Sequence, residues 1–187
     1  MKEFKVAIIG QIARWKGQDI LIKAAKRLQP KYPQMRFQII GDVLFEKEEE
    51  LRFKDYLIDL AKDYEYIQFL GHREDILKVL KDIDILVHAS IREEPFGRVI
   101  IEGMASKKPV IAAGIGGPLE IIEDGISGIL YEPGNEKELA FKLEELIKDE
   151  RFYSIIANGG HKRFLEKFNI RSTVSKVEEY IELVSNK

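Results

Sequence analysis

Near its start the sequence reads Phe4-Lys5-Val6-Ala7-Ile8-Ile9-Gly10, and after a short loop it continues from Gln18 to Leu28. The first stretch is a short apolar run that ends at a glycine, which is typical of a strand buried on both faces. The second has the i, i+3, i+4 apolar spacing of an amphipathic helix. Its apolar positions are Ile20, Leu21, Ala24, Ala25 and Leu28. A buried strand followed directly by a helix is the repeating unit of a parallel α/β sheet.

The same strand and helix alternation continues along the rest of the chain. Because parallel strands that are apolar on both faces need helices on both sides, it predicts an α/β fold with a doubly wound, Rossmann-like parallel sheet. Ligands of such sheets bind beyond the carboxyl ends of the strands, so the loops after residues 9, 40, 70, 88 and 113 are candidate binding loops. We expect strands at 4–9, 36–40, 66–70, 83–88, 109–113 and 128–131, and helices at about 18–28, 46–63, 73–81, 99–106, 136–148, 150–167 and 170–185.

Length and composition favour one globular domain over residues 1–187, since 45% of the residues are hydrophobic and 33% are charged. No run approaches the ~20 apolar residues of a transmembrane helix, and the N-terminal sequence lacks the pattern of a signal peptide. The absence of cysteine excludes disulfides and thiolate metal sites and, with the missing signal peptide, indicates a cytoplasmic location. A net charge of −2 argues against a nucleic-acid partner. The abundance of Lys, Glu and Ile favours a thermophilic source.

The loop after the first strand, Gly10-Gln11-Ile12-Ala13-Arg14-Trp15-Lys16-Gly17, leads into a helix whose first N–H groups have no partner within that helix. With Lys16 and Arg14 nearby, this helix start is a candidate diphosphate site. A surface loop with solvated cations is the alternative. The loop has neither the P-loop pattern nor G-x-G-x-x-G, so a dinucleotide site has no local support.

A second candidate loop follows the expected strand that ends at His88, and it contains Glu94, Gly97 and Arg98 before the helix that carries Glu102. The two carboxylates could accept hydrogen bonds from sugar and ribose hydroxyls. Free N–H groups at the helix start could hold a phosphate. Alternatively, Glu94 caps the helix and Glu102 is a partly exposed side chain.

A third candidate loop, Gly114-Ile115-Gly116-Gly117-Pro118, has three glycines in four positions, which permits close approach of the backbone to a ligand. A simple tight turn is the alternative.

The sequence offers little support for a metal site. Asp82-Ile83-Asp84 resembles the D-x-D of metal-dependent sugar transferases, but it lies at the start of a strand, where a structural role is expected. The three histidines show no metal-ligand spacing.

Together these loops resemble the C-terminal domain of glycosyltransferase family 4, which has the GT-B fold. The family's pattern E-x-F-G-x4-E stands here as Glu94-Pro95-Phe96-Gly97 through Glu102. Further matches are Trp15-Lys16-Gly17, Gly116-Gly117-Pro118-Leu119-Glu120 and Asp124-Gly125-Ile126-Ser127-Gly128. The resemblance covers nearly the whole chain.

The resemblance implies two catalytic residues, Lys16 at the donor diphosphate and Glu94 at hydroxyls of the transferred sugar. It implies that Glu102 binds the ribose. The family usually has an arginine where this sequence has Gln11, and Arg14 is the nearby substitute. Further implied or candidate contacts to the donor are Gly10, Gln11, Arg14, His72, Arg73, Phe96, Gly97, Arg98, Val99, Gly116 and Gly117.

The resulting hypothesis is the donor-binding domain of a retaining glycosyltransferase that transfers a hexosyl group from a UDP-, GDP- or ADP-sugar without a metal or other cofactor. The acceptor would be bound by an N-terminal domain that these residues do not include, and the helix at about 170–185 would pack on it. Peripheral membrane association of the full enzyme remains open. The alternatives are a stand-alone nucleotide-sugar-binding module and a sugar-nucleotide epimerase, although the glutamate pair with Phe96-Gly97 argues against the epimerase.

Overall fold

The computed structural model describes residues 3–45 and 47–170 of the chain. One parallel sheet of six strands has the order β3-β2-β1-β4-β5-β6. The order confirms the doubly wound Rossmann-like fold, because the chain winds first to one side of β1 and then to the other. The strands are β1 (Phe4–Ile9), β2 (Met35–Ile40), β3 (Ile67–Gly71), β4 (Ile85–His88), β5 (Val110–Ala113) and β6 (Ile129–Tyr131).

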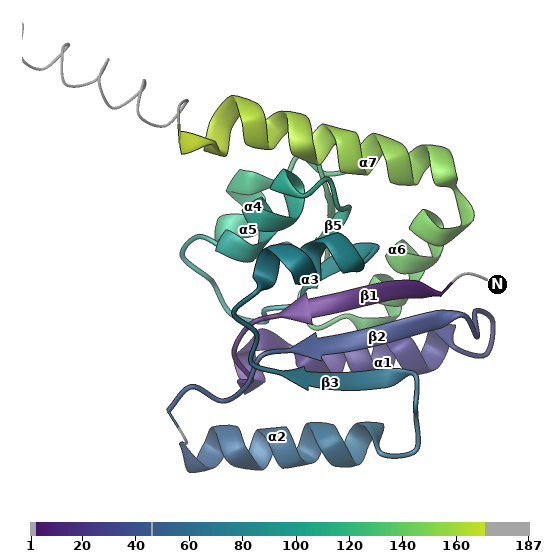
Figure 1. Ribbon diagram of the computed structural model, residues 1–187, viewed down its shortest axis with the longest axis vertical. Coiled ribbons are helices and arrows are strands. Elements are labelled where there is room, and N and C mark those ends of the chain that lie inside the picture. The colour runs from purple at the N-terminus through teal and green to yellow at the C-terminus, as the bar shows by residue number, and fades with distance from the viewer. Residues whose placement is uncertain (1–2, 46, 171–187) are drawn as a thin grey trace, which may run out of the picture.

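Helices connect the strands and cover both faces of the sheet (Figure 1). Two buried clusters of side chains form the core, one on each face. The first joins β1, β2 and β4 to α1, α2 and α6, and the second joins the opposite side of β1 and β4 to α3, α4 and α5. The helices are α1 (Gln18–Leu28), α2 (Glu48–Ala61), α3 (Ile76–Asp82), α4 (Arg98–Ala105), α5 (Gly117–Ile121), α6 (Glu136–Lys148) and α7 (Glu150–Arg163), with the 3₁₀ turn η1 (Arg14–Lys16) and the π-helix η2 (Phe164–Phe168) that continues α7.

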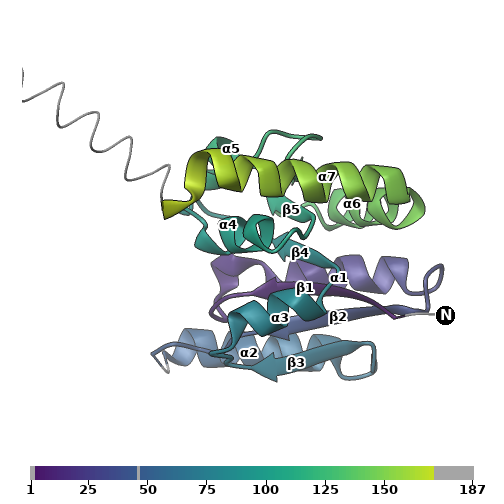
Figure 2. The same cartoon turned by 45° about the horizontal axis from the view of Figure 1, so that its top comes forward.

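Helix α7 crosses the molecule next to α6 and α4, and Figure 2 shows it running over this layer. Tyr153 Oη on α7 donates a 2.8 Å hydrogen bond to the carbonyl oxygen of Asp84 at the start of β4. Of the helix expected at 170–185, all but Ile170 lies outside the described residues. Across the described ranges, every helix is too short or too polar to span a bilayer.

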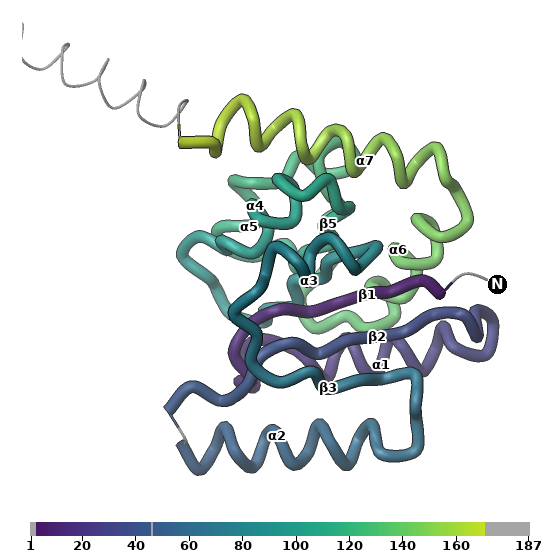
Figure 3. Tube along the Cα trace, in the orientation of Figure 1, coloured from purple at the N-terminus to yellow at the C-terminus, as the bar shows by residue number. Residues whose placement is uncertain are grey.

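The switch point of the sheet lies between β1 and β4, which pair with each other while their following helices cover opposite faces. The arrowheads of β1, β2 and β3 point to the same side of Figure 1, and the tube in Figure 3 shows that the loops following them gather there. Because β4 pairs in parallel with β1, the loops after β1 and β4 lie side by side at this carboxyl edge, where ligands of such sheets bind.

Several boundaries differ from the sequence expectation, and at two of them particular side chains account for the difference. The helix expected from residue 73 begins at Ile76, because Arg73 and Asp75 form an ion pair of 2.6 Å in the loop before it. The strand expected from residue 83 begins at Ile85, and the Asp84 carboxylate accepts the backbone N–H of Lys5 at 2.7 Å. This contact confirms the structural interpretation of Asp84.

Candidate functional site

A pocket of about 600 Å³ opens at the carboxyl edge of the sheet, beyond β1, β2, β3 and β4. This volume lies within the range of small-molecule and cofactor sites. The pocket is lined by Ile9, Gly10, Gln11, Lys16, Ile40, Gly41, Asp42, Leu44, His72, Arg73, Ile76, Glu94, Pro95, Phe96, Gly97, Arg98, Val99 and Glu102. The structure thus brings together the predicted contacts of the Lys16 loop and of the Glu94 loop.

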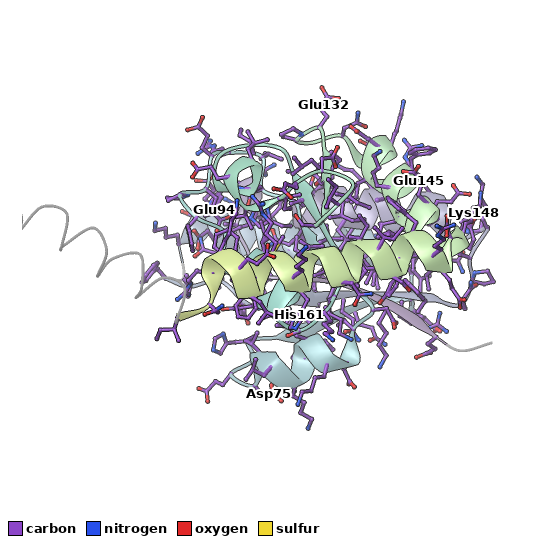
Figure 4. All side chains as sticks on the ribbon, turned by 90° about the horizontal axis from the view of Figure 1, so that it is seen from above. Asp75, Glu94, Glu132, Glu145, Lys148 and His161 are labelled. Carbon is purple, nitrogen blue, oxygen red and sulfur yellow. The ribbon has the colours of Figure 1, made fainter. Side chains whose placement is uncertain are left out.

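Glu94 is the most densely hydrogen-bonded side chain of the pocket. Lys16 Nζ lies 2.8 Å from each of its carboxylate oxygens. On the other side, His88 Nε2 is 2.7 Å and Ser90 Oγ 3.0 Å from Oε2. The hydrogen bonds from these two sides hold the carboxylate in one orientation. Figure 4 labels Glu94, which lies toward the opposite end of the molecule from Lys148.

These contacts decide the charge of Glu94. Burial favours the neutral acid, but the hydrogen bonds from His88 and Lys16 outweigh it and lower the pKa of Glu94 from 4.5 to about 2. Glu94 is therefore an anion at neutral pH. An ionised carboxylate accepts hydrogen bonds and has no proton to donate.

Helix α4 starts at the pocket, where the backbone N–H groups of Arg98 and Val99 have no partner among the described residues, whereas that of Ile100 donates to the carbonyl of Gly97 at 3.0 Å. Its N-cap, Gly97, adopts the left-handed conformation at φ 76°, and no side chain of residues 3–45 and 47–170 caps the helix. The alternative in which Glu94 caps this helix is therefore wrong. Such a helix start attracts anions, phosphate in particular.

Two charged side chains of α4, Arg98 and Glu102, line the pocket. Arg98 is exposed and Glu102 is half-buried, and they stand four positions apart. Within the described residues no ion pair joins them, and neither has another charged partner. Both remain available to a ligand.

The Lys16 loop is held against the end of β4 by a close backbone approach. Turn η1 ends at Gly17, whose φ is 70°, and a Cβ at this position would lie 2.0 Å from the carbonyl oxygen of Ala89. The backbone N–H of Ile91 donates to the carbonyl of Trp15 at 2.8 Å. The Trp15 ring also lies 4.3 Å from Lys16 Nζ. These contacts place Lys16 opposite Glu94 although 78 residues separate them.

The opposite end of the pocket is formed by the loops after β2 and β3. The Asp42 carboxylate pairs with Lys54 at 2.7 Å, and hydrogen bonds from Lys54 and from the backbone N–H of Val43 lower its pKa. The Arg73 guanidinium donates two hydrogen bonds to the carboxylate of Asp75. His72 is exposed at the rim.

A model of the family described as "Glycosyl transferases group 1" matches residues 1–163. The chain belongs to the group 1 glycosyl transferases.

Curated relatives in this family are about twice as long as the chain. An uncharacterized glycosyltransferase of Methanocaldococcus jannaschii is 35% identical over 181 residues, which cover 95% of this chain and 48% of the relative. CapM, a capsular polysaccharide biosynthesis glycosyltransferase of Staphylococcus aureus, is 30% identical over 89% of this chain and 42% of the relative. The chain therefore spans about half the length of the curated relatives it matches.

Solved group 1 and related structures share the fold. HepE of Anabaena in complex with UDP has a TM-score of 0.88 and 32% identity, covering 97% of this chain and 49% of that chain. Its complex with UDP-glucose has a TM-score of 0.86 and 32% identity over 96% of this chain and 49% of that chain. The C-terminal domain of the group 1 protein LpcC from Francisella tularensis has a TM-score of 0.82 and 33% identity, with 90% and 88% covered.

Three predicted contacts of this glycosyltransferase domain lie outside the pocket lining. Arg14 packs over the Phe53 ring, with 5.1 Å from its Cζ to the ring centroid, and lines a separate hollow of about 270 Å³. Gly116 and Gly117 lie behind the Glu94 loop. A Cβ on Gly117 would lie 2.8 Å from the carbonyl oxygen of Phe96, and its N–H donates to the carbonyl of Glu94 at 2.9 Å. The glycines therefore permit loop-to-loop packing.

The sequence-based set of site residues omitted Ser90, Asp42 and the apolar side chains of Leu44 and Ile76. Ser90 follows β4 by two residues, so its position after a strand was the available signal. Its contact with Glu94 depends on how the loop between the two residues folds back, and the spacing of apolar residues in the sequence does not determine that fold.

Within the described ranges no three histidine, aspartate or glutamate side chains form a cluster that could hold a metal ion.

Proposed function

We propose that this chain is the donor-binding domain of a retaining family 4 glycosyltransferase, which transfers a hexosyl group from a nucleoside diphosphate sugar to an acceptor. The observation that carries the proposal is the pocket itself. It combines a cation, a free helix start and two carboxylates at the carboxyl edge of the sheet. Each of these features matches one chemical part of such a donor.

The diphosphate is best placed between Lys16 and the start of α4. The free N–H groups of α4 are preorganised for an anion, and Lys16 adds a positive charge beside them. Arg98 lines the same end of the pocket with no acidic partner among the described residues, so it supplies the second cation. Arg14, which packs on Phe53, is the weaker choice for that role. With these groups present, we propose that transfer requires no metal ion.

The two carboxylates are assigned to hydroxyl groups. Glu102 is half-buried without a charged partner among the described residues and is placed at the ribose. Glu94 is placed at the transferred sugar. Because the pKa of Glu94 is about 2, it acts as a fixed acceptor that orients the sugar, and a general-acid role is disfavoured.

The acceptor is assigned to a further domain. The curated relatives are about twice the length of this chain, and the C-terminal domain of LpcC has been crystallised with nearly the same extent. We therefore propose that residues 1–187 bind the donor as one domain and that a partner domain completes the cleft. UDP is the first nucleotide to test, because HepE is complexed with UDP and UDP-glucose.

Isothermal titration calorimetry of the 187-residue chain with UDP-glucose, GDP-mannose and ADP-glucose tests the proposal. We expect one of the three to bind at one site per chain, and the other two to bind at least about tenfold more weakly, which corresponds to about 1.4 kcal/mol. Inorganic pyrophosphate is the control for charge alone. Absence of binding by all three donors, or binding no tighter than pyrophosphate, would contradict the proposal.

A further inference from the structure

The Glu94 carboxylate is held by two sets of donors that differ in mobility. Lys16 reaches it from turn η1 on a long side chain. His88 and Ser90 reach it from the end of β4, and both are buried, at 4% and 1% exposure. Strand β4 is hydrogen-bonded on both sides, to β1 and to β5. His88 is consequently fixed by the sheet, whereas Lys16 can turn.

A bound diphosphate would compete with Glu94 for Lys16. The ammonium group of Lys16 serves both carboxylate oxygens at 2.8 Å. A diphosphate carries more negative charge than a carboxylate and would lie at the adjacent start of α4, so it draws the ammonium group toward itself. Glu94 then keeps only the contacts from His88 and Ser90. Without them, nothing in its described surroundings would hold the carboxylate toward a sugar.

The burial of His88 has no other explanation in its surroundings. The rest of β4 is apolar, and an aliphatic side chain would fill the same space without desolvating an imidazole. Nε2 is directed at Glu94 and also lies 3.3 Å from Ser90 Oγ, while the buried Nδ1 has no partner among the described residues. A carboxylate accepts, so the proton lies on Nε2. The imidazole is thus a donor with Glu94 as its target.

We propose that His88, assisted by Ser90, is the positioning residue that holds Glu94 in place to receive hydroxyl groups of the donor sugar after Lys16 has turned to the diphosphate. The proposal rests on the proposed function. It assigns to His88 a contribution to recognition of the sugar and none to recognition of the nucleotide. That division is measurable, because UDP contains the nucleotide part of UDP-glucose without the sugar.

The test compares the affinities of four variants for UDP and for UDP-glucose by calorimetry. If the wild-type chain binds GDP-mannose or ADP-glucose instead, that nucleotide sugar is compared with GDP or ADP. His88→Leu removes the donor, and His88→Gln keeps an N–H at nearly the same reach. Ser90→Ala removes the second donor. Ser127→Ala is the matched control, because Ser127 is also a buried serine but hydrogen-bonds the backbone of Glu123.

We expect His88→Leu to reduce the affinity for UDP-glucose relative to UDP by about tenfold, the scale of one hydrogen bond to a charged group. The affinity for UDP should stay within about twofold of wild type, which also shows that the variant is folded. His88→Gln should restore most of the loss. Ser90→Ala should show a smaller loss and Ser127→Ala none.

A double-variant cycle completes the test. In the Glu94→Gln background, His88→Leu should change the relative affinity by less than about twofold, because the two residues act as one unit. An unchanged ratio in His88→Leu, or an equal loss of UDP and UDP-glucose binding in that variant, would overturn the positioning role while leaving the proposed function standing. If wild type binds no nucleotide or nucleotide sugar, the proposed function fails, and the inference fails with it.

Discussion

Glu94 is surrounded by donors that keep it charged in a half-buried position. Its side chain is 17% exposed, yet Lys16, His88 and Ser90 all direct hydrogens at its two oxygens. Charge-assisted hydrogen bonds of this kind are stronger than neutral ones. The arrangement makes Glu94 a rigid acceptor, and it links the stability of the fold to the ionisation of one carboxyl group.

We predict that Glu94 contributes to the pH dependence of stability. Its pKa is about 2 in the fold and 4.5 ordinarily, so its ionisation stabilises the folded chain above pH 4.5, and this contribution is lost as the pH falls toward 2. Urea unfolding of wild type and Glu94→Gln between about pH 6 and about pH 3 should show a difference that shrinks toward acid. Glu93→Gln, at the exposed neighbouring carboxylate, should retain the wild-type pH dependence. A constant difference between Glu94→Gln and wild type would contradict this prediction.

Lys16 is predicted to act on the second phosphate of the donor. Lys16→Met keeps the aliphatic stem but removes the charge beside α4, and it leaves Glu94 without its neutralising partner. Binding of UDP should weaken by about tenfold or more, and binding of UMP by less, since a charged contact contributes roughly 1.5–3 kcal/mol. Lys62→Met, which removes a lysine paired with Asp59 on α2, is the control. Equal losses for UDP and UMP would place Lys16 elsewhere on the nucleotide.

At the scale of elements, the site depends on loops that approach each other more closely than side chains allow. Turn η1 touches the end of β4 at Gly17, and the start of α5 touches the Glu94 loop at Gly117. Each contact brings a loop after one strand against a loop after its neighbour. The glycines therefore build the pocket wall without lining it at these two positions.

We predict that Gly17→Ala is strongly destabilising, whereas Gly125→Ala is mild. Both glycines have φ near +70°, so both substitutions carry the left-handed backbone cost of about 1–2 kcal/mol. Only at Gly17 does the added Cβ meet backbone, at 2.0 Å from the carbonyl oxygen of Ala89. By thermal unfolding, Gly125→Ala should lower the Tm by roughly 2–8 °C, and Gly17→Ala by clearly more. Similar shifts would mean that the loop relaxes freely.

The positions of the strands and of most helices could be predicted because burial on one or both faces of an element determines the spacing of its apolar residues in the sequence. All six expected strands form, and β1 and α1 have the expected bounds. Boundaries set by particular side chains were missed, as at Ile76, where Arg73 and Asp75 pair before the helix. A helix was expected after the glycine loop, with Pro118 in its first turn, but the bounds of the five-residue helix α5 could not be predicted for a related reason. Its start depends on contact with Phe96, far away in sequence.

The same distinction applies to the site. Loops at the carboxyl edge could be placed from strand ends, and resemblance to a family singled out Lys16, Glu94 and Glu102 within them. The separation of Arg14 from the pocket could not be predicted, because it depends on packing against Phe53 of α2. The buried contact of His88 with Glu94 could not be predicted either, since it requires the loop between the two residues to fold back over the end of β4.

At the scale of the whole molecule, α7 ties together parts that are distant in sequence. Tyr153 joins it to the start of β4. At its other end, Arg163 is 11% exposed, donates to the carbonyl oxygens of Ile121 and Glu120, and pairs with Glu123. These contacts fasten the end of α7 to α5, which lies next to the pocket wall.

Arg163→Ala is predicted to destabilise the fold by about 1–3 kcal/mol, because it leaves two carbonyl groups without their donor. Arg52→Ala is the matched control, since Arg52 is exposed and, within the described part of the chain, pairs only with Glu48 one turn away on α2. That change should stay within about 0.5 kcal/mol. Urea unfolding measures both, and equal effects would show that the end of α7 contributes little to the stability of the domain.

The most direct measurement is a crystal structure of the chain with UDP bound. We predict the diphosphate between Lys16 and the start of α4, with the ribose hydroxyls at Glu102 and Glu94 left facing the position of the sugar. Binding of UDP in the smaller hollow beside Arg14 and Arg92, or a pocket at the carboxyl edge that stays unoccupied at saturating UDP, would contradict the assignment of this pocket to a uridine nucleotide.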